Sequence, residues 1–272
     1  MRRVILALCL AGAALCAAAE PLRVVSSIKP LQLLVTAIGG DEVDSRVLLP
    51  PGFSPHDAQL KPSQWKLLAD AELLVWVGPA LEQFLDKAFG SRANALALQS
   101  LVGADDDPHI WMSLANVSVI ARHLSAELSR RRPLKKALFY SNAARLVSAL
   151  RRQDEALRQA FRAPSPRYLL PHDGYRHFER QYGLAPAAVV SPGDDQMPGT
   201  SHIVSLRSRL LAGEFACVFR EPQHESRLLG RLLEGVDVRV IPLDSMGIAV
   251  ANDREGFVEY YRALGEAFLA CQ

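Results

Sequence analysis

The chain has 272 residues, a formal net charge of +2, and hydrophobic side chains at 49% of its positions. This length allows two domains of ordinary size. A charge so close to neutral gives no bulk electrostatic reason to expect nucleic acid as a partner, and none is predicted.

The chain begins like a secretory signal. Residues 1–3 are basic, residues 4–19 form an apolar run, and three alanines precede Glu20. The run is too short to span a membrane, so residues 1–19 are predicted to be a signal peptide cleaved after Ala19. We expect a soluble periplasmic protein. Cys16 leaves a lipid anchor as an alternative, although Leu15 before it fits a lipoprotein signal poorly.

Expected strands and helices alternate over residues 20–133. Short β-branched or apolar runs predict strands at residues 22–27, 43–49 and 73–77. Helical spacing predicts helices at residues 29–38, 64–69 and 81–89. The run at 73–77 is continuously apolar, as in a buried parallel sheet. Residues 20–133 are therefore predicted to form an N-terminal α/β lobe.

A helical pattern follows from residue 115 to about residue 162 and is interrupted near Pro133. Its second part, residues 135–162, contains neither Gly nor Pro and would form a helix about 42 Å long. This length exceeds the need of one domain. Residues 134–163 are therefore predicted to be a rigid linking helix between two lobes.

The alternation resumes over residues 164–272, which are predicted to form a C-terminal α/β lobe. Strands are expected at residues 168–170, 187–190, 217–219 and 238–243. Helices are expected at residues 177–182, 203–212, 227–234 and 253–271.

Two cysteines, Cys217 and Cys271, remain after the signal is removed. An even pair in an exported protein favours one disulfide, which would stabilise the fold by about 4 kcal/mol. Two buried free thiols are the alternative.

Three histidines stand where a metal ligand would be held rigidly. His56, His109 and His172 each directly follow a proline, so each is expected at a stiff turn. Imidazole suits zinc, and three histidines leave a fourth position for a carboxylate or water. His172 and Asp244 both follow an expected strand, where ligands gather in open α/β sheets.

Other polar residues near these turns have two interpretations. Asp57 and Asp173 would either orient the imidazoles or only form the turns. Tyr175 and Glu221 lie close in sequence to site or cleft segments, and a role in supporting the ligands is left open for them. The remaining histidines are expected to be packing or surface residues, with a weak second site at His202 and His224 left open. Core positions are expected for Trp65, Trp76 and Trp111.

Taken together, the motifs resemble a known family. They are Ser54-Pro-His-Asp57 with Lys61-Pro-Ser63, Leu74-Val-Trp-Val-Gly-Pro79, Asp107-Pro-His-Ile-Trp-Met112, His172-Asp-Gly-Tyr175, Glu221-Pro-Gln223 and Leu243-Asp-Ser-Met-Gly247. In these the chain resembles the metal-binding solute-binding proteins of ABC importers, in particular the zinc-uptake group of the cluster A-I family. The likeness covers essentially the whole mature chain.

This resemblance implies two Rossmann-like lobes joined by one long helix, with the metal in the cleft between them. It implies a monomeric zinc carrier, not an enzyme, that delivers Zn²⁺ to the permease of an ABC importer. The implied ligands are His56, His109 and His172, and a histidine at the third position favours zinc over manganese. Asp244 is the expected fourth ligand, because Pro55 stands where some zinc members have a glutamate. The Cys217–Cys271 disulfide is implied as well.

One departure concerns the loop before the second ligand. Many zinc members have a long loop rich in His and Asp there, whereas residues 90–107 are short and lack histidine. Loading by a periplasmic metallochaperone and reliance on the main site alone both stay open. The alternative functions are a manganese or iron carrier or adhesin of the same fold, and an exported zinc hydrolase. The hydrolase would lack any HExxH motif.

Overall fold

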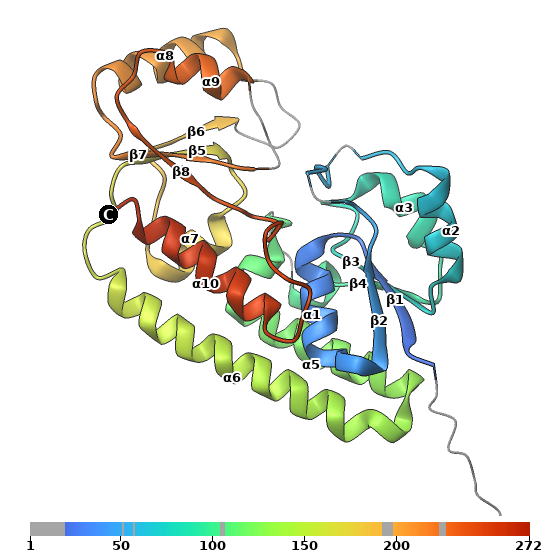
Figure 1. Cartoon of the computed structure of the whole chain (residues 1–272). Helices are drawn as coiled ribbons and strands as arrows, with labels where there is room; N and C mark the ends of the chain where they lie inside the picture. Colours follow the sequence, from blue (N-terminus) through green and yellow to red (C-terminus); the bar gives the residue numbers. More distant parts are fainter. Residues whose placement is uncertain (1–19, 51, 57, 104–106, 192–197, 223–226) are drawn as a thin grey trace, which may run out of the picture.

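The computed structural model describes residues 20–50, 52–56, 58–103, 107–191, 198–222 and 227–272. These residues form two α/β lobes, each built on a four-stranded parallel sheet (Figure 1). The predicted fold class is therefore confirmed. The predicted signal peptide, residues 1–19, lies outside the described residues.

The first lobe contains a sheet with the strand order β2-β1-β3-β4. Its strands are β1 (Leu22–Ser26), β2 (Val43–Val47), β3 (Leu73–Trp76) and β4 (Ala95–Ala97). Strand β3 is buried along its whole length, as its continuous apolar sequence predicts. Strand β4 was not predicted, because three residues of the sequence Ala-Leu-Ala carry too little pattern to indicate a strand.

The two faces of this sheet are covered by different helices. Helix α1 (Lys29–Gly39) packs in one core with Val24 and Val75. Helices α2 (Pro62–Asp70) and α3 (Gln83–Phe89) pack in a separate core with Val25 and Leu74. Successive strand residues therefore face opposite cores, which is the period of two expected for a strand. A short helix, α4 (Gln99–Val102), follows β4.

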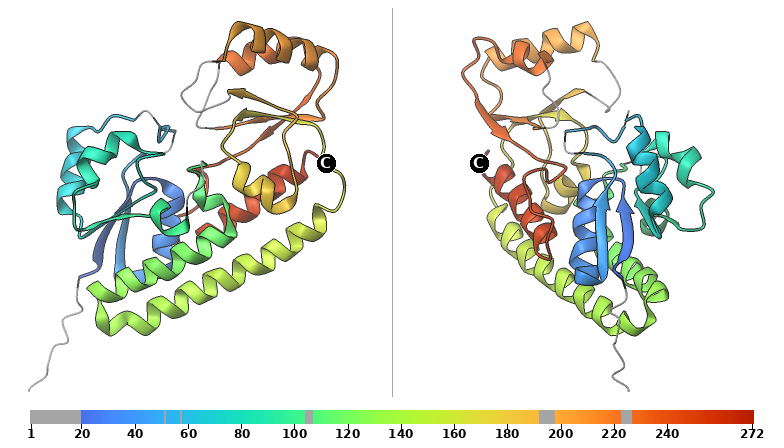
Figure 2. Two further views of the ribbon diagram at one scale, coloured as in Figure 1. Left: turned by 180° about the vertical axis from the view of Figure 1, so that it is seen from behind. Right: turned by 45° about the vertical axis from the view of Figure 1, so that its right-hand side comes forward.

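Two long antiparallel helices lie beneath both lobes (Figures 1 and 2). Helix α5 (Leu114–Arg131) begins at Ser113, whose hydroxyl oxygen accepts a hydrogen bond from the Asn116 amide at 3.3 Å. A 3-10 turn, Pro133–Lys135, separates it from helix α6 (Lys136–Ala160). Helix α6 has 25 residues, so it is about 38 Å long, and the predicted long helix between the two halves is confirmed.

The second lobe repeats the topology of the first, with the strand order β6-β5-β7-β8. Its strands are β5 (Tyr168–His172), β6 (Ala188–Ser191), β7 (Cys217–Arg220) and β8 (Arg239–Pro242). Its helices are α7 (Arg176–Tyr182), α8 (Thr200–Leu211), α9 (Arg227–Leu233) and α10 (Gly256–Leu269). A disulfide joins Cys217 at the start of β7 to Cys271 near the end of the chain, which confirms the predicted pairing.

The lobes share part of their hydrophobic core. Helix α10 packs against α1 and α6 at its start, while Phe268 near its end packs against Tyr168 and Phe219 of the second lobe. One continuous cluster of buried side chains accordingly includes Leu33, Tyr168 and Phe268. The last helix therefore belongs to both lobes, although it follows the second one in sequence.

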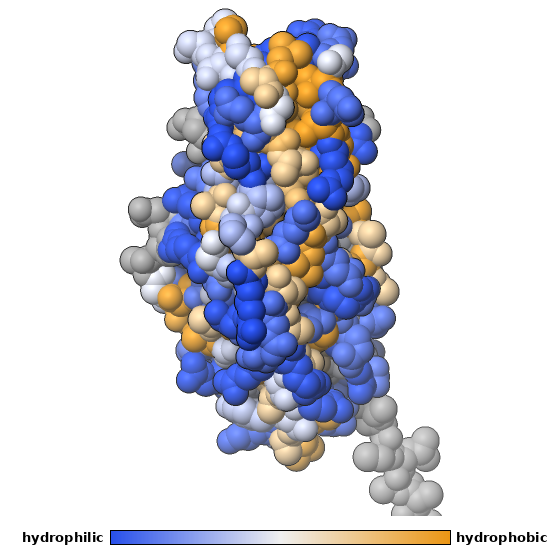
Figure 3. All heavy atoms as spheres, turned by 90° about the vertical axis from the view of Figure 1, so that its left-hand side faces the viewer, coloured by the Kyte–Doolittle hydropathy of each residue, from blue (hydrophilic) through white to orange (hydrophobic). Residues whose placement is uncertain are grey.

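The surface on the left of Figure 1 is mostly hydrophilic, with apolar side chains gathered in a strip over the upper lobe (Figure 3). Among the described residues, no helix is both long and apolar enough to cross a membrane.

Candidate metal centre

The structure brings the three predicted histidines together between the lobes. His56 lies in the loop after β2, His109 directly precedes the 3-10 turn Ile110–Met112, and His172 is the last residue of β5. The ring centroids of His56 and His109 are 5.6 Å apart, and those of His109 and His172 are also 5.6 Å apart. His109 is therefore the central ring of the three, in contact with one histidine from each half of the chain.

The ring of His109 is held by Asp107. Oδ1 of Asp107 accepts a hydrogen bond from the His109 amide at 3.0 Å and lies 2.7 Å from Nδ1 of the ring. Burial acts to raise the pKa of Asp107, but the hydrogen bonds and charge of His109 outweigh it and hold the pKa below its usual value. An ionised carboxylate only accepts, so Nδ1 carries the proton and Nε2 keeps its lone pair.

A second buried carboxylate holds the ring of His172. Oε2 of Glu221 lies 2.8 Å from Nδ1 of His172, and Glu221 is only 1% exposed. The hydroxyl of Tyr175 donates a hydrogen bond to Oε1 of the same carboxylate. Burial, followed by the negative charge of Glu221, raises the pKa of Tyr175 well above its usual value, so this hydroxyl keeps its proton.

Both Nε2 atoms face the same small space beside Gly174. A Cβ atom placed on Gly174 would lie 2.1 Å from Nε2 of His172 and 3.1 Å from Nε2 of His109. Any side chain at this position would therefore displace His172. The Nε2 atoms of these two rings converge at a point where the backbone comes close and only glycine fits.

His56 is presented by a loop. The hydroxyl oxygen of Ser54 accepts a hydrogen bond from the His56 amide at 3.2 Å, which fixes the turn that follows Pro55. Asp57, which was expected either to orient an imidazole or to form this turn, lies outside the described residues.

Asp244 lies just past the end of β8 and is half-buried. Its Oδ1 accepts from the Met246 amide at 3.0 Å, and its Oδ2 accepts from the Ala249 amide at 3.4 Å. Burial raises the pKa of Asp244, and the loop amides oppose that rise. In the described part of the chain the carboxylate therefore organises its own loop, which is the turn chemistry that the sequence also permits.

No three side chains of the His, Cys, Asp or Glu type form a closed metal-binding group within the described ranges. A tetrahedral zinc site places all its ligand atoms about 2 Å from one ion. The ring-centroid separations of 5.6 Å place the three imidazoles next to one another around a common space.

His177, which the sequence indicated only as a packing or surface residue, lies beside Asp107, the residue that holds the ring of His109. Its Nε2 is 3.0 Å from the carbonyl oxygen of Asp107 and 3.9 Å from Oδ2 of the same residue. His177 belongs to α7 of the second lobe, so it connects that lobe to the segment that carries His109. The spacing between His172 and His177 did not predict this role, because His177 contacts Asp107 and does not share a helix face with His172.

The structure describes the surroundings of three further candidates, His123, His202 and Asp173. His123 is exposed on α5, and Nε2 of His202 is 2.9 Å from the carbonyl oxygen of Val189. His224 lies outside the described residues. Asp173 pairs with Arg176 at 3.4 Å.

Two of the three tryptophans are core residues, as expected. Trp76 is 3% exposed, and Trp111 is fully buried with its ring edge-on to His109 at 5.3 Å. The expectation for Trp65 is wrong, because its side chain is 48% exposed. It lies on the outer surface of α2, where Leu68 is the buried residue.

The sequence profile of the family described as zinc-uptake complex component A, periplasmic (ZnuA), matches residues 24–271. The chain belongs to this family. It is 29% identical to the high-affinity zinc uptake system protein ZnuA of Paracoccus denitrificans (strain Pd 1222), over 98% of this chain and 97% of that protein. Identity to the protein of the same name from Yersinia pestis is 28%, over 91% of this chain and 90% of that protein.

A solved structure, the crystal structure of ZnuA, has a TM-score of 0.80 to this chain at 24% identity. The match covers 93% of this chain and 99% of the other. At this identity the likeness establishes the fold, with its two parallel sheets and the long helix beneath them.

Proposed function

We propose that this protein is a periplasmic zinc carrier that binds one Zn²⁺ ion between its lobes and delivers it to an ABC-type importer. One observation carries the proposal. His109 and His172 come from opposite lobes, each has its Nδ1 atom against a buried carboxylate, and their Nε2 atoms face one space. The names of the relatives and membership of the family support the choice of zinc uptake.

The proposed ligands are the Nε2 atoms of His56, His109 and His172. Three neutral imidazoles favour zinc over manganese, which prefers oxygen ligands. Asp107 and Glu221 would fix the tautomers of two rings and raise the basicity of their Nε2 atoms. Asp244 is the proposed fourth ligand, because a carboxylate oxygen can bind zinc while the same group accepts hydrogen bonds from loop amides.

Delivery follows from the position of the site. Because the ligands come from both lobes, a movement of one lobe away from the other would separate the ligands and lower the affinity for zinc. We propose that the monomeric protein docks on the importer through both lobes and that docking drives this change. A periplasmic metallochaperone is a proposed additional partner. The protein acts as a carrier, in keeping with a family of transport components, and not as an enzyme.

The test is zinc binding by the chain from Glu20 onward. Competition with a chromophoric chelator should show one tightly held zinc in the wild type and a loss of at least about 100-fold in affinity in His109→Ala. His123→Ala is the matched control, because His123 is exposed on α5. A wild type that holds manganese but not zinc would refute the choice of ion. Zinc binding that survives His109→Ala unchanged would refute the site.

A further inference from the structure

The segment that carries Asp244 is fastened to the opposite lobe. After β8 the chain runs through residues 243–255, here called the connecting segment, before α10 begins. Nζ of Lys29, the first residue of α1 in the first lobe, donates to the carbonyl oxygen of Val250 at 2.6 Å and to that of Ile248 at 3.3 Å. A residue of the N-terminal lobe thus holds the backbone just beyond Asp244.

Lys29 is suited to this role by its surroundings. It is half-buried, and among the described residues it forms no ion pair with a carboxylate. Its ammonium group therefore depends on the two carbonyl oxygens of the connecting segment. An ammonium group that is partly removed from water needs such acceptors, and the carbonyl oxygens would lose a charged donor without it.

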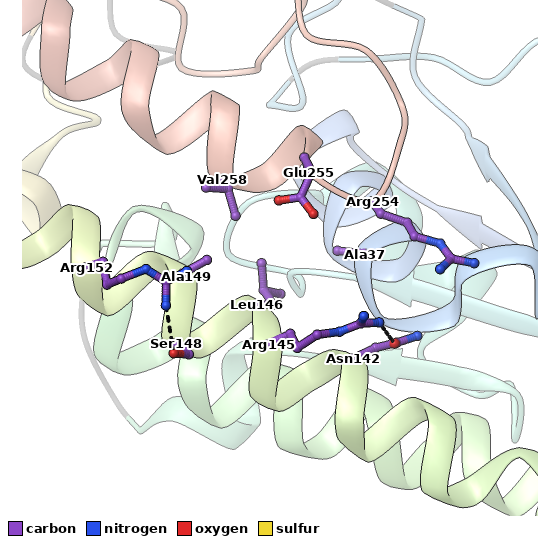
Figure 4. A pocket seen from close by; sticks show the side chains of 10 residues that line it. All are labelled: Ala37, Asn142, Arg145, Leu146, Ser148, Ala149, Arg152, Arg254, Glu255 and Val258. Atoms are coloured by element: carbon purple, nitrogen blue, oxygen red, sulfur yellow. Dashed lines mark hydrogen bonds between the residues drawn. The ribbon is translucent and has the colours of Figure 1, made fainter.

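Two further contacts continue the attachment along α1. Oγ1 of Thr36 lies 2.8 Å from Oδ1 of Asn252, and the Arg254 guanidinium donates to Oδ2 of Asp41 at 2.7 Å. Figure 4 shows Arg254 extending from the segment before α10 toward α1. Asp41 is 92% exposed and the Thr36–Asn252 contact is also exposed, so water weakens both and the contacts of Lys29 carry most of the attachment.

The other end of the connecting segment is tied to the chain that carries His109. The carbonyl oxygen of Ser245, next to Asp244, accepts hydrogen bonds from Nε1 of Trp111 at 3.1 Å and from the hydroxyl of Tyr260 at 3.0 Å. Trp111 is two residues from His109, and the two rings are in contact. The backbone that follows Asp244 is therefore held by the N-terminal lobe at two points, Ser245 and Val250, whereas Leu243 before it donates to the carbonyl oxygen of Arg220 in β7.

We infer that Lys29 is a positioning residue that keeps Asp244 with the N-terminal lobe. When the lobes separate, three of the four proposed ligands then stay together and one moves away. His56, His109 and Asp244 stay together as one set, and His172 alone moves with the second sheet. This inference rests on the proposed function, because it requires Asp244 to be a ligand. It assigns zinc release to the withdrawal of His172, with Lys29 maintaining the remaining three ligands.

A double-mutant cycle on zinc affinity tests the inference. Lys29→Met removes the donor and keeps the length of the side chain, and it should weaken zinc binding about tenfold. In the Asp244→Ala background the same change should have almost no effect, because the ligand that it positions is gone. In the His172→Ala background the tenfold effect should persist. Lys29→Arg, which retains the donors, should restore most of the affinity.

The outcomes separate the two proposals. If wild type binds no zinc, the proposed function fails. If wild type binds zinc and Asp244→Ala binds as tightly, or if Lys29→Met weakens binding equally in both backgrounds, only the positioning role fails. Should Lys29→Met not fold, the same cycle is run with Lys29→Gln, which removes the charge and shortens the side chain. An effect of Lys29→Gln that is equal in the wild-type and Asp244→Ala backgrounds would overturn the inference.

Discussion

Nδ1 of His172 lies 2.8 Å from Oε2 of Glu221, in an environment that leaves the glutamate 1% exposed. The relation mirrors that of His109 and Asp107 in the other lobe. Each lobe therefore contributes an imidazole whose Nδ1 atom lies against a buried carboxylate.

Glu221→Gln should weaken zinc binding by about 10- to 100-fold. The amide keeps the shape of the carboxylate but can present its NH₂ group to Nδ1, which would place the ring proton on Nε2 and block the metal. Zinc competition measures the effect, and Glu234→Gln, an exposed change in the same lobe, serves as control. Equal affinities in the wild type and Glu221→Gln would show that the contact does not orient the ring.

Gly174→Ala should abolish tight zinc binding with little change in overall fold. Its Cβ atom would lie 2.1 Å from Nε2 of His172, so the ring has to leave its position. Gly199→Ala is the matched control, because a Cβ there meets nothing within 4 Å. The readouts are zinc affinity and the thermal midpoint of each variant. Retained affinity in Gly174→Ala would mean that His172 binds zinc from a different position.

Glu82 should make the stability of the protein depend on pH. It is fully buried, and burial raises its pKa from 4.5 to about 7 against the hydrogen bonds from Ser27 and the Gly78 amide. The folded protein therefore keeps a proton that the unfolded chain has lost between these values. The stability from this group is complete below pH 4.5 and is lost as the pH rises through about 7.

Glu82→Gln should therefore unfold at nearly the same urea concentration as wild type at pH 4.5 and at a higher concentration at pH 8.5. The difference in unfolding free energy should reach up to about 3 kcal/mol. Only the difference between the two proteins is diagnostic, because burial also raises the pKa of Glu179 to about 7. A difference that stays constant with pH would contradict the assignment to Glu82.

Replacing both cysteines, Cys217→Ser with Cys271→Ser, should lower the free energy of unfolding by about 2–5 kcal/mol. The bond closes a loop with a sequence separation of 54 and ties β7 to the end of the chain. Zinc affinity should be unchanged, since neither cysteine contacts a ligand. A shift in zinc affinity comparable to the loss of stability would show that the disulfide also shapes the site.

Much of this architecture was predictable from the sequence, because its signals are local. Each signal is carried by one continuous stretch of sequence. These stretches are the apolar run of β3, the uninterrupted helical pattern of α6 and the Pro-His pairs. Strand β4 was missed because its three residues are held by pairing with β3 and not by their own pattern. Trp65 was misplaced because its side chain points outward from a helix that buries only Leu68.

The partners behind the histidines were harder to predict, because they come from distant parts of the chain. Glu221 and His172 are brought together by the second sheet, and His177 reaches Asp107 across the lobes. Lys29 meets Val250 only because α10 carries the connecting segment back to α1. Neither residue spacing nor composition reports such contacts.

The shared core determines when the N-terminal lobe can finish folding during synthesis of the chain. Gly256 packs so closely on Leu33 that an added Cβ would lie 2.9 Å from its Cδ2 atom, so the outer side of α1 is covered by residues near the end of the chain. The N-terminal lobe is synthesised first but cannot bury this side until the last helix arrives. Ribosome-bound or truncated chains that end before Gly256 would leave it uncovered and available to chaperones, so the lobe that is synthesised first completes its folding no earlier than the second.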